Sequence, residues 1–335
     1  MSHESPGRPA FLWALCIGCV LTSAAWGCSS ADAGGDALES GAGIAQPACS
    51  RVVATVDFGF SRLLDATVAL DEETTAIEAL ESVATVETSY GGCFVERIDG
   101  VGRGDSGGDR NRVDWFYFVN GFLAHKGGCE YVLSDGDVQH WDNHDWRFRR
   151  DVSATLGVFP NAFVHGYGGV ARPTTVVFEA GYAAEAEALA TELAAAGTGD
   201  VAVVDTVGLD GTDRDTHNLV LVAGPDEPLV VELYGVRERV GLFTALEPGT
   251  LVVFAADGAV SATFGTGTGV IEAMQNPWNP RGTGACENAV LLVSGTDEEG
   301  VRAAANALIR SWRDFGLWAA AIVVESEPAR VPLGG

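Results

Sequence analysis

The stretch DWFYFVNG, residues 114–121, constrains the fold of this chain more than any other segment. In an extended strand, successive side chains point to opposite faces, so Trp115 and Tyr117 share one face. Phe116 and Phe118 then share the other face. One face has to fill a core beneath a helix, and we expect the other to pack against a second domain or to offer a flat aromatic surface to a ligand. The Asn-Gly pair that ends the stretch is a hairpin-turn signal.

The residues around this strand predict a small, strand-rich α+β domain with one helix, over residues 49–147. Residues 51–57 alternate like a half-buried strand. Residues 74–83 place apolar side chains at helical spacing, and Glu78 follows Thr75 at the spacing of a capping box.

Three motifs carry a resemblance to a known family: YGGCFVERI at 90–98, DWFYFVNG, and YVLSDGDVQHW at 131–141. In this order, after one short helix, they are similar to the transcobalamin-like C-terminal domain family over residues 50–147. The resemblance implies a β-grasp-like layout and a site for a corrinoid such as cobalamin, or for another small ligand. The vertebrate cobalamin carriers hold their ligand between this module and a large helical barrel. This sequence has no helical repeat array, so half of such a site is missing.

The N-terminal sequence predicts export. Residues 10–25, AFLWALCIGCVLTSAA, match the apolar core of a signal peptide in length and are too short to span a membrane. The following cysteine, Cys28, resembles the acylated cysteine of a lipobox, although Ala25 stands where leucine is usual. We expect a signal peptide over 1–27, a lipid on Cys28 and a flexible linker over 28–48. The alternative is an ordinary secretory signal, which would leave the protein secreted. Either signal predicts an extracytoplasmic location.

Charge and length restrict the classes of function. The chain carries 46 acidic and 20 basic residues, for a formal net charge of −26. Such a surface repels phosphate backbones, so we expect no nucleic-acid partner. The 335 residues suffice for two domains beyond the leader and the linker.

Four cysteines lie beyond the leader and the lipobox: Cys49, Cys93, Cys129 and Cys286. In an oxidising compartment they permit three pairings, which spacing alone does not distinguish. We expect a Cys93–Cys129 disulfide, because each cysteine follows a Gly-Gly pair and begins a strand-like run. Metal binding is the rival interpretation, but the sequence has no CxxC or compact Cys/His spacing, so no metal is predicted.

The second half of the chain predicts an α/β domain of unknown function with a mainly parallel sheet, over residues 173–330 after a connector at 148–172. Apolar runs alternate there with helical patterns. The helix expected over 297–315 would have Thr296 as its N-cap and Glu299 as the acidic residue of a capping box. The expected strands lie at 175–178, 201–205, 218–224, 251–255, 289–295 and 319–325, and a further helix at 182–196.

Catalytic motifs are absent from the sequence, and we predict that the protein is not an enzyme. The GTGTG run at 265–269 lacks the lysine and spacing of a phosphate-binding loop, so we interpret it as a flexible turn at a helix start. Cys286 as a nucleophile would need a nearby base, and His217 is the only histidine of this half beyond the connector.

The aromatic strand and its neighbours supply the first set of candidate ligand-binding residues: Tyr90, Trp115, Tyr117, Asn120 and Trp141. A large planar ligand suits stacked aromatic rings with a few amide donors. The alternative is that these side chains serve only the core and the packing between domains.

The long Pro/Gly/Asn-rich loop over 275–288 supplies a second set: Trp278, Asn279 and Arg281. It enters a buried strand, where α/β folds often bind ligands. The alternative is a structural loop with a buried or bridged Cys286.

The HWDNHD segment places His140, Asp142 and His144 on one face of a strand, so a metal site is geometrically possible there. Solvated polar residues at a strand end are the ordinary alternative, and we do not predict a metal.

These features predict an exported, lipid-anchored surface protein that captures a corrinoid or another small metabolite for a membrane uptake transporter. The alternative is an envelope structural or adhesion module without a small-molecule ligand.

Overall fold

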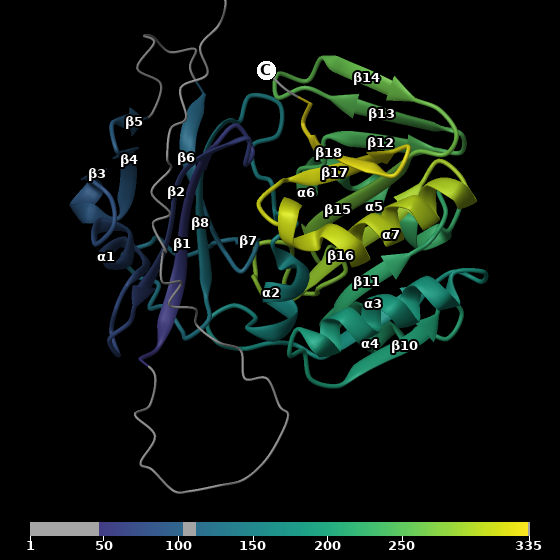
Figure 1. Ribbon diagram of the computed structural model, residues 1–335, viewed down its shortest axis with the longest axis horizontal. Helices are drawn as coiled ribbons and strands as arrows, with labels where there is room; N and C mark the ends of the chain where they lie inside the picture. The colour runs from purple at the N-terminus through teal and green to yellow at the C-terminus, as the bar shows by residue number, and fades with distance from the viewer. Residues whose placement is uncertain (1–46, 103–111, 334–335) are drawn as a thin grey trace, which may run out of the picture. The chain divides into compact units, whose positions relative to one another are not determined.

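The aromatic stretch forms the strand β6 (Val113–Val119), which lies inside a five-stranded sheet of the computed structural model (Figure 1). The structure describes residues 47–102 and 112–333, which belong to one unit of the chain. The predicted signal peptide, Cys28 and nearly all of the predicted linker lie outside the described residues. No helix in the described ranges is long and apolar enough to cross a membrane.

The five-stranded sheet has the order β2-β1-β8-β6-β7. Its central pair, β1 and β8, is parallel, and the other neighbours are antiparallel. The Asn-Gly pair between β6 and β7 turns the chain as predicted, with positive φ at both Asn120 and Gly121. The other strands of this sheet are β1 (Cys49–Val56), β2 (Ser61–Ala69), β7 (Phe122–Leu123) and β8 (Val138–Asp145).

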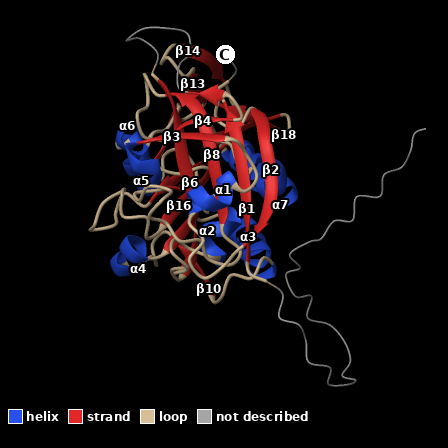
Figure 2. Cartoon of the chain, turned by 90° about the vertical axis from the view of Figure 1, so that its left-hand side faces the viewer, coloured by secondary structure: helices blue, strands red, loops and turns tan. Residues whose placement is uncertain are grey.

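One face of this sheet packs beneath the helix α1 (Ala76–Glu81), which lies in front of the strands in Figure 2. Trp115 and Tyr117 belong to this core, as expected for one face of the aromatic strand. The predicted capping box between Thr75 and Glu78 is confirmed. A small separate sheet follows α1 and contains β3 (Val86–Ser89), β4 (Phe94–Ile98) and β5 (Val101–Gly102).

The opposite face of the sheet turns toward the second half of the chain. Phe116 and Phe118 stack on histidines of β8 there. Phe58, in the turn between β1 and β2, contacts Phe243 of the second half edge to face at 5.0 Å. The two faces of the aromatic strand therefore have different partners: the core beneath α1 on one side and the histidines of β8 on the other.

The second half is built on a seven-stranded sheet with the order β10-β9-β11-β16-β15-β17-β18. The first four strands are parallel, and the remaining neighbours are antiparallel. Its strands are β9 (Thr174–Phe178), β10 (Val201–Asp205), β11 (Asn218–Val222), β15 (Gly269–Gln275), β16 (Ala289–Gly295), β17 (Ala320–Val324) and β18 (Glu327–Val331).

Helices cover both faces of this sheet (Figure 1). The helices α2 (Val158–Val164), α3 (Ala183–Ala195) and α7 (Glu298–Phe315) contribute to one core. The helices α5 (Pro228–Gly235) and α6 (Arg237–Val240) contribute to the other. A three-stranded sheet also joins the second core, and the short helix α4 (Gly211–Thr216) precedes β11. The three strands are β12 (Thr244–Glu247), β13 (Thr250–Phe254) and β14 (Val260–Phe264).

Four sequence-based expectations for this half need correction. The sheet is parallel over only half of its neighbours, because an apolar run indicates burial but not strand direction. The run at 251–255 belongs to the separate three-stranded sheet. The segment after the GTGTG turn is the fully buried strand β15, not a helix. The N-cap of α7 is Asp297, because the Thr296 hydroxyl instead donates to the backbone oxygens of Gly265 and Thr268.

Glu272 is a carboxyl group buried in the core of the second half, on β15. The Thr244 hydroxyl donates to its Oε1 at 2.5 Å, while Oε2 has no hydrogen-bond partner in the part of the chain that the structure describes. Burial raises the pKa of Glu272 to about 7, because a charged carboxylate is poorly solvated there.

Replacing Glu272 by Gln is expected to remove a pH dependence of stability. The folded state favours the protonated carboxyl, since the pKa rises from 4.5 to about 7 on folding. The Glu272 carboxyl therefore contributes about 3 kcal/mol to the free energy of unfolding below pH 4.5. This contribution is lost as the pH rises through about 7. Urea unfolding over this pH range should show the wild-type free energy of unfolding falling relative to Glu272→Gln. Glu247→Gln, on the exposed end of β12, is the control and should follow the wild type. Parallel curves for wild type and Glu272→Gln would contradict the prediction.

Candidate functional site

Three of the predicted ligand-binding side chains line one groove: Trp115, Tyr117 and Trp141. They come from β6 and β8, whose register places Tyr117 directly opposite Trp141. The groove has a volume of about 310 Å³, and we call it the aromatic groove. Period-two alternation of side chains along the two strands brings these residues to the same face.

The rings of the aromatic groove are held firmly by their neighbours. Tyr117 and Trp141 stack with their centroids 4.3 Å apart. Trp141 donates its indole N–H to Gln139 Oε1 at 2.9 Å, and Trp115 donates to the backbone oxygen of Val101 at 3.3 Å. The exposed fractions of Trp115, Tyr117 and Trp141 are only 7%, 8% and 3%. The rings therefore form both the wall of the groove and part of the core beneath α1.

A disulfide closes one side of the aromatic groove. Cys93 and Cys129 are bonded, as predicted from their Gly-Gly contexts, and Cys93 lines the groove. Gly128 lies against the Trp141 ring, and a Cβ there would approach that ring to 2.9 Å. Only glycine therefore lets the segment before Cys129 pass so close to Trp141. His125 and Lys126, the single lysine of the chain, also line the groove.

The other two residues of the first set lie apart from these rings. Tyr90 is 82% exposed and contacts Phe94, a lining residue, edge to face at 6.0 Å. Asn120 is fully buried, and its amide donates to Asp137 Oδ1 and to the backbone oxygen of Gly166, both at 2.7 Å. Its side chain thus fixes the turn after β6 and is not presented to a ligand in the groove.

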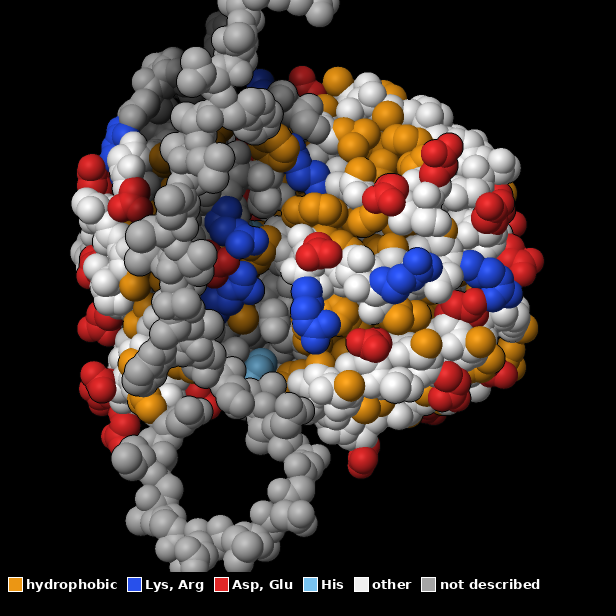
Figure 3. All heavy atoms as spheres, in the orientation of Figure 1, with side chains coloured by type: hydrophobic (Ala, Val, Ile, Leu, Met, Phe, Trp, Pro, Cys, Tyr) orange, Lys and Arg blue, Asp and Glu red, His pale blue; other side chains and the backbone are white. Residues whose placement is uncertain are grey.

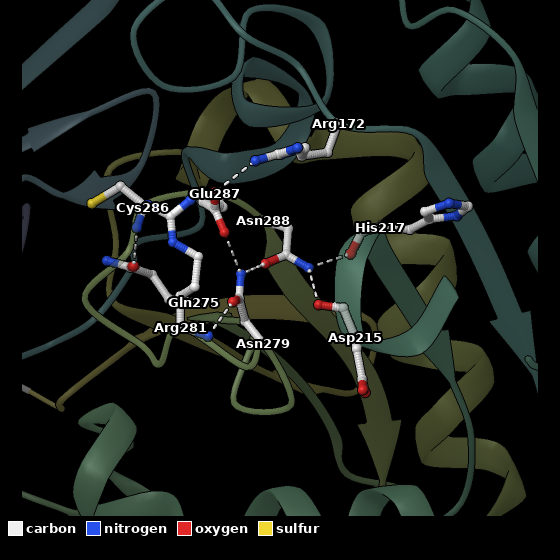
Figure 4. Close-up of polar contacts among 9 residues, drawn as sticks. All are labelled: Arg172, Asp215, His217, Gln275, Asn279, Arg281, Cys286, Glu287 and Asn288. Atoms are coloured by element: carbon white, nitrogen blue, oxygen red, sulfur yellow. Dashed lines mark hydrogen bonds and ion pairs between the residues drawn. The ribbon is translucent and has the colours of Figure 1, made fainter. Parts of the chain in front are cut away.

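Two of the predicted loop residues, Asn279 and Arg281, lie in a polar network (Figure 4). Asn279 donates to Asn288 at 2.6 Å and to Glu287 at 3.2 Å. Arg281 and Arg172 both pair with Glu287. Trp278 donates its indole N–H to Glu232 at 2.9 Å. These side chains satisfy one another, which supports the alternative of a structural loop.

Cys286 is the free cysteine of the described residues, and its surroundings do not suit a nucleophile. It is 3% exposed, and burial raises the pKa of its thiol to about 11. Its Sγ lies 3.1 Å from the backbone oxygen of Leu123. Figure 4 shows His217 at the opposite end of the polar network, where its Nδ1 contacts Thr175 at 2.9 Å. A thiol held protonated and far from His217 is not activated by that imidazole.

The HWDNHD segment forms a buried hydrogen-bond network on the other face of the sheet. Asp142 is 2% exposed and accepts from the Thr55 hydroxyl at 2.5 Å and from His144 Nδ1 at 2.6 Å. Its carboxylate also accepts the backbone N–H groups of Phe58 and Gly59, at 3.0 and 3.1 Å. Burial alone would raise the pKa of Asp142, but the hydrogen bond and charge of His144 lower it to about 2.

His144 lies between two aromatic rings, with centroids 4.3 Å from Phe58 and 4.2 Å from Phe116. The prediction that His140, Asp142 and His144 share a face is confirmed, because His140 and Asp142 both contact Thr55 and His144 contacts Asp142. Among the residues that the structure describes, no group of three or more His, Cys, Asp or Glu side chains could hold a metal ion. The close approach of Thr55 and of the turn residues to Asp142 depends on pairing between β1 and β8, which the sequence did not indicate.

A comparison with protein families matches part of the first half of this chain. Residues 73–145 match the family described as Domain of unknown function (DUF4430), which covers the strands of the aromatic groove. A solved structure from Ruminococcus gnavus ATCC 29149, described as "a putative metal binding protein", is 14% identical and covers 29% of this chain and 95% of that chain. Its TM-score is 0.22, at which the likeness carries no argument about fold or function. No curated protein matches the chain. The transcobalamin-like family is not confirmed by these matches.

Replacing Asp142 by Asn should destabilise the protein strongly. Asn has one acceptor oxygen in place of two and turns its amide toward groups that are themselves donors. We expect the free energy of unfolding to fall by about 3 kcal/mol or more, as for other buried charge networks that lose one partner. Urea denaturation measures the change. The control is Asp145→Asn, at the end of the same strand, which breaks an ion pair with the exposed Arg147 and should cost less than about 1 kcal/mol. Similar losses in both variants would refute this role of Asp142.

Proposed function

We propose that this protein is an exported, lipid-anchored surface protein that binds a small planar ligand in the aromatic groove. The observation that carries the proposal is the convergence of Trp115, Tyr117 and Trp141 on one groove. Stacked aromatic walls favour flat, conjugated ligands. The export and the lipid anchor in this proposal are based on the leader sequence and on Cys28.

The size of the groove favours a small ligand. Pockets for small molecules span about 300–1,000 Å³, and the aromatic groove, at about 310 Å³, lies at the lower end. A corrinoid, which the family resemblance implies, would be only partly covered. His125 and Lys126 beside the rings offer hydrogen bonds and a positive charge to an acidic substituent of the ligand.

The arrangement of the first half supports the β-grasp-like layout of the proposal. Its sheet has a parallel central pair of strands and one helix over one face. The proposal divides the chain into this domain at 49–147, a connector at 148–172 and an α/β domain at 173–330.

In this proposal, the ligand passes to a membrane uptake transporter, and nucleic acids are repelled by the acidic surface.

A second candidate function is an envelope structural or adhesion module. The observation that favours it is the burial of the same aromatic rings, each less than one tenth exposed. Side chains so deeply packed contribute to the core whether or not a ligand binds.

Ligand titration with a groove-blocking variant separates the two candidates. A Cβ on Gly127 would have ordinary contacts with Cys93 and Cys129, so Gly127→Leu should fold and place its branched end in the groove. Gly199→Leu, at an open position outside the groove, is the matched control. The full chain is titrated with cobinamide, cobalamin and riboflavin by calorimetry and absorbance, and thermal unfolding verifies that both variants fold.

We expect saturable binding of at least one of these planar probes, weakened about tenfold or more by Gly127→Leu and unchanged in Gly199→Leu. If binding is unchanged in Gly127→Leu, the ligand does not bind in the aromatic groove. Failure of every probe at high micromolar concentration would overturn the binding proposal in favour of the structural module.

A further inference from the structure

A second cavity lies on the other face of the five-stranded sheet, between that sheet and the end of α7. It has a volume of about 120 Å³ and shares no lining residue with the aromatic groove. Its walls include Arg51, Arg62, His140, Trp312, Arg313 and Trp318, and we call it the arginine cleft. We propose that the arginine cleft binds a small oxyanion that also carries a hydroxyl group, such as a hydroxycarboxylate or hydrogen phosphate.

Positive charge gathers at the arginine cleft although the chain as a whole is strongly acidic. Arg51 pairs with Asp65 through two hydrogen bonds, at 2.9 and 2.8 Å, and Arg62 pairs with the same carboxylate at 2.8 Å. One carboxylate thus serves two guanidinium groups and leaves a surplus of positive charge. On the face shown in Figure 3, Lys and Arg side chains gather between the five-stranded sheet and the second half of the chain.

Arg313 adds a guanidinium that is free to meet a ligand. Within the described ranges it has no ion pair, and it lies over the ring of Trp312 at 4.0 Å. Asp314 is the acidic residue among the lining side chains, so the cationic groups outnumber the carboxylates around the cleft. A planar guanidinium held against an aromatic ring presents its N–H groups in a fixed direction, which suits carboxylate and phosphate oxygens.

His140 supplies the second half of the recognition. His140 lines the cleft and is 3% exposed. Nε2 lies 2.6 Å from Thr55 Oγ1, and the Thr55 hydroxyl hydrogen is already donated to the ionised Asp142. Nε2 must therefore carry the hydrogen and donate it to Thr55, which leaves Nδ1 as an acceptor. This Nδ1 has less than 1 Å² of accessible surface and no hydrogen-bond partner among the described residues, so a ligand reaches it only if the wall of the cleft shifts on binding.

The His140 acceptor defines the ligand further. Burial lowers the pKa of His140 to about 4, so the ring is neutral near pH 7 and does not add to the positive charge. A buried acceptor without a partner is unfavourable, and a ligand hydroxyl that reaches it and donates to it would recover much of that loss. An oxyanion without a donor group would leave Nδ1 unsatisfied. The cleft volume of about 120 Å³ favours a ligand with few non-hydrogen atoms.

The test uses the full chain and compares glycolate with acetate, which lacks the hydroxyl. Binding is followed by calorimetry and by the fluorescence of the tryptophans that line the cleft. We expect saturable glycolate binding, weaker acetate binding, and a loss of about tenfold or more in glycolate affinity in Arg313→Gln. Arg310→Gln removes an exposed charge from the same helix outside the cleft and is the matched control.

Three further comparisons decide the outcome. In His140→Asn, the preference for glycolate over acetate should fall, whereas a general loss of folding would lower both affinities and the thermal midpoint together. Inorganic phosphate that binds in the same Arg313-dependent way, and better than glycolate, would support the oxyanion site and assign it to phosphate. No saturable binding of either probe at about 10 mM, or equal effects of Arg313→Gln and Arg310→Gln, would overturn the proposal. Gly127→Leu should leave glycolate binding intact, so failure of the aromatic groove proposal is distinguishable from failure here.

Discussion

The rest of the first half depends on one buried charge, the carboxylate of Asp142. It accepts hydrogen bonds from Thr55, His144 and the backbone N–H groups of Phe58 and Gly59. A buried carboxylate is tolerated only when its oxygens are satisfied, so these donors cannot move independently. Phe58 and Gly59 both have positive φ, and a Cβ on Gly59 would approach the backbone oxygen of Leu317 to 2.7 Å. The carboxylate therefore fixes the turn that meets the second half of the chain.

The strand that carries Asp142 also separates the two proposed sites. Trp141 faces the aromatic groove, whereas His140 faces the arginine cleft. This follows from the alternation of side chains along β8, with α1 covering one face and the second half covering the other. Because the Thr55 hydroxyl is committed to Asp142, the same carboxylate also sets which nitrogen of His140 is free. On one side of the sheet, Thr55 thus links the structural carboxylate of Asp142 to the ligand-recognising ring of His140. The aromatic groove on the other side depends instead on the packing of its rings.

The sequence was sufficient for features that depend on local patterns. The turn at Asn120, the capping box at Thr75 and the common face of Trp115 and Tyr117 all follow from residue type and spacing. Features set by distant partners were not accessible. The antiparallel half of the larger sheet, the N-cap at Asp297 and the closed network around Glu287 depend on segments that meet only after folding. Aromatic spacing likewise located the ring wall of the groove, but not how deeply the rings would be buried.

The acidity of the chain affects the two proposed sites differently. A net charge of −26 gives a field that opposes the approach of any anion, and salt screens this field over about 10 Å at moderate ionic strength. A neutral planar molecule entering the aromatic groove is insensitive to this term. An oxyanion reaching the arginine cleft meets long-range repulsion first and the guanidinium groups only at contact. Discrimination at the cleft must therefore come from short-range geometry, from the guanidinium of Arg313 and the acceptor of His140, and not from electrostatic steering.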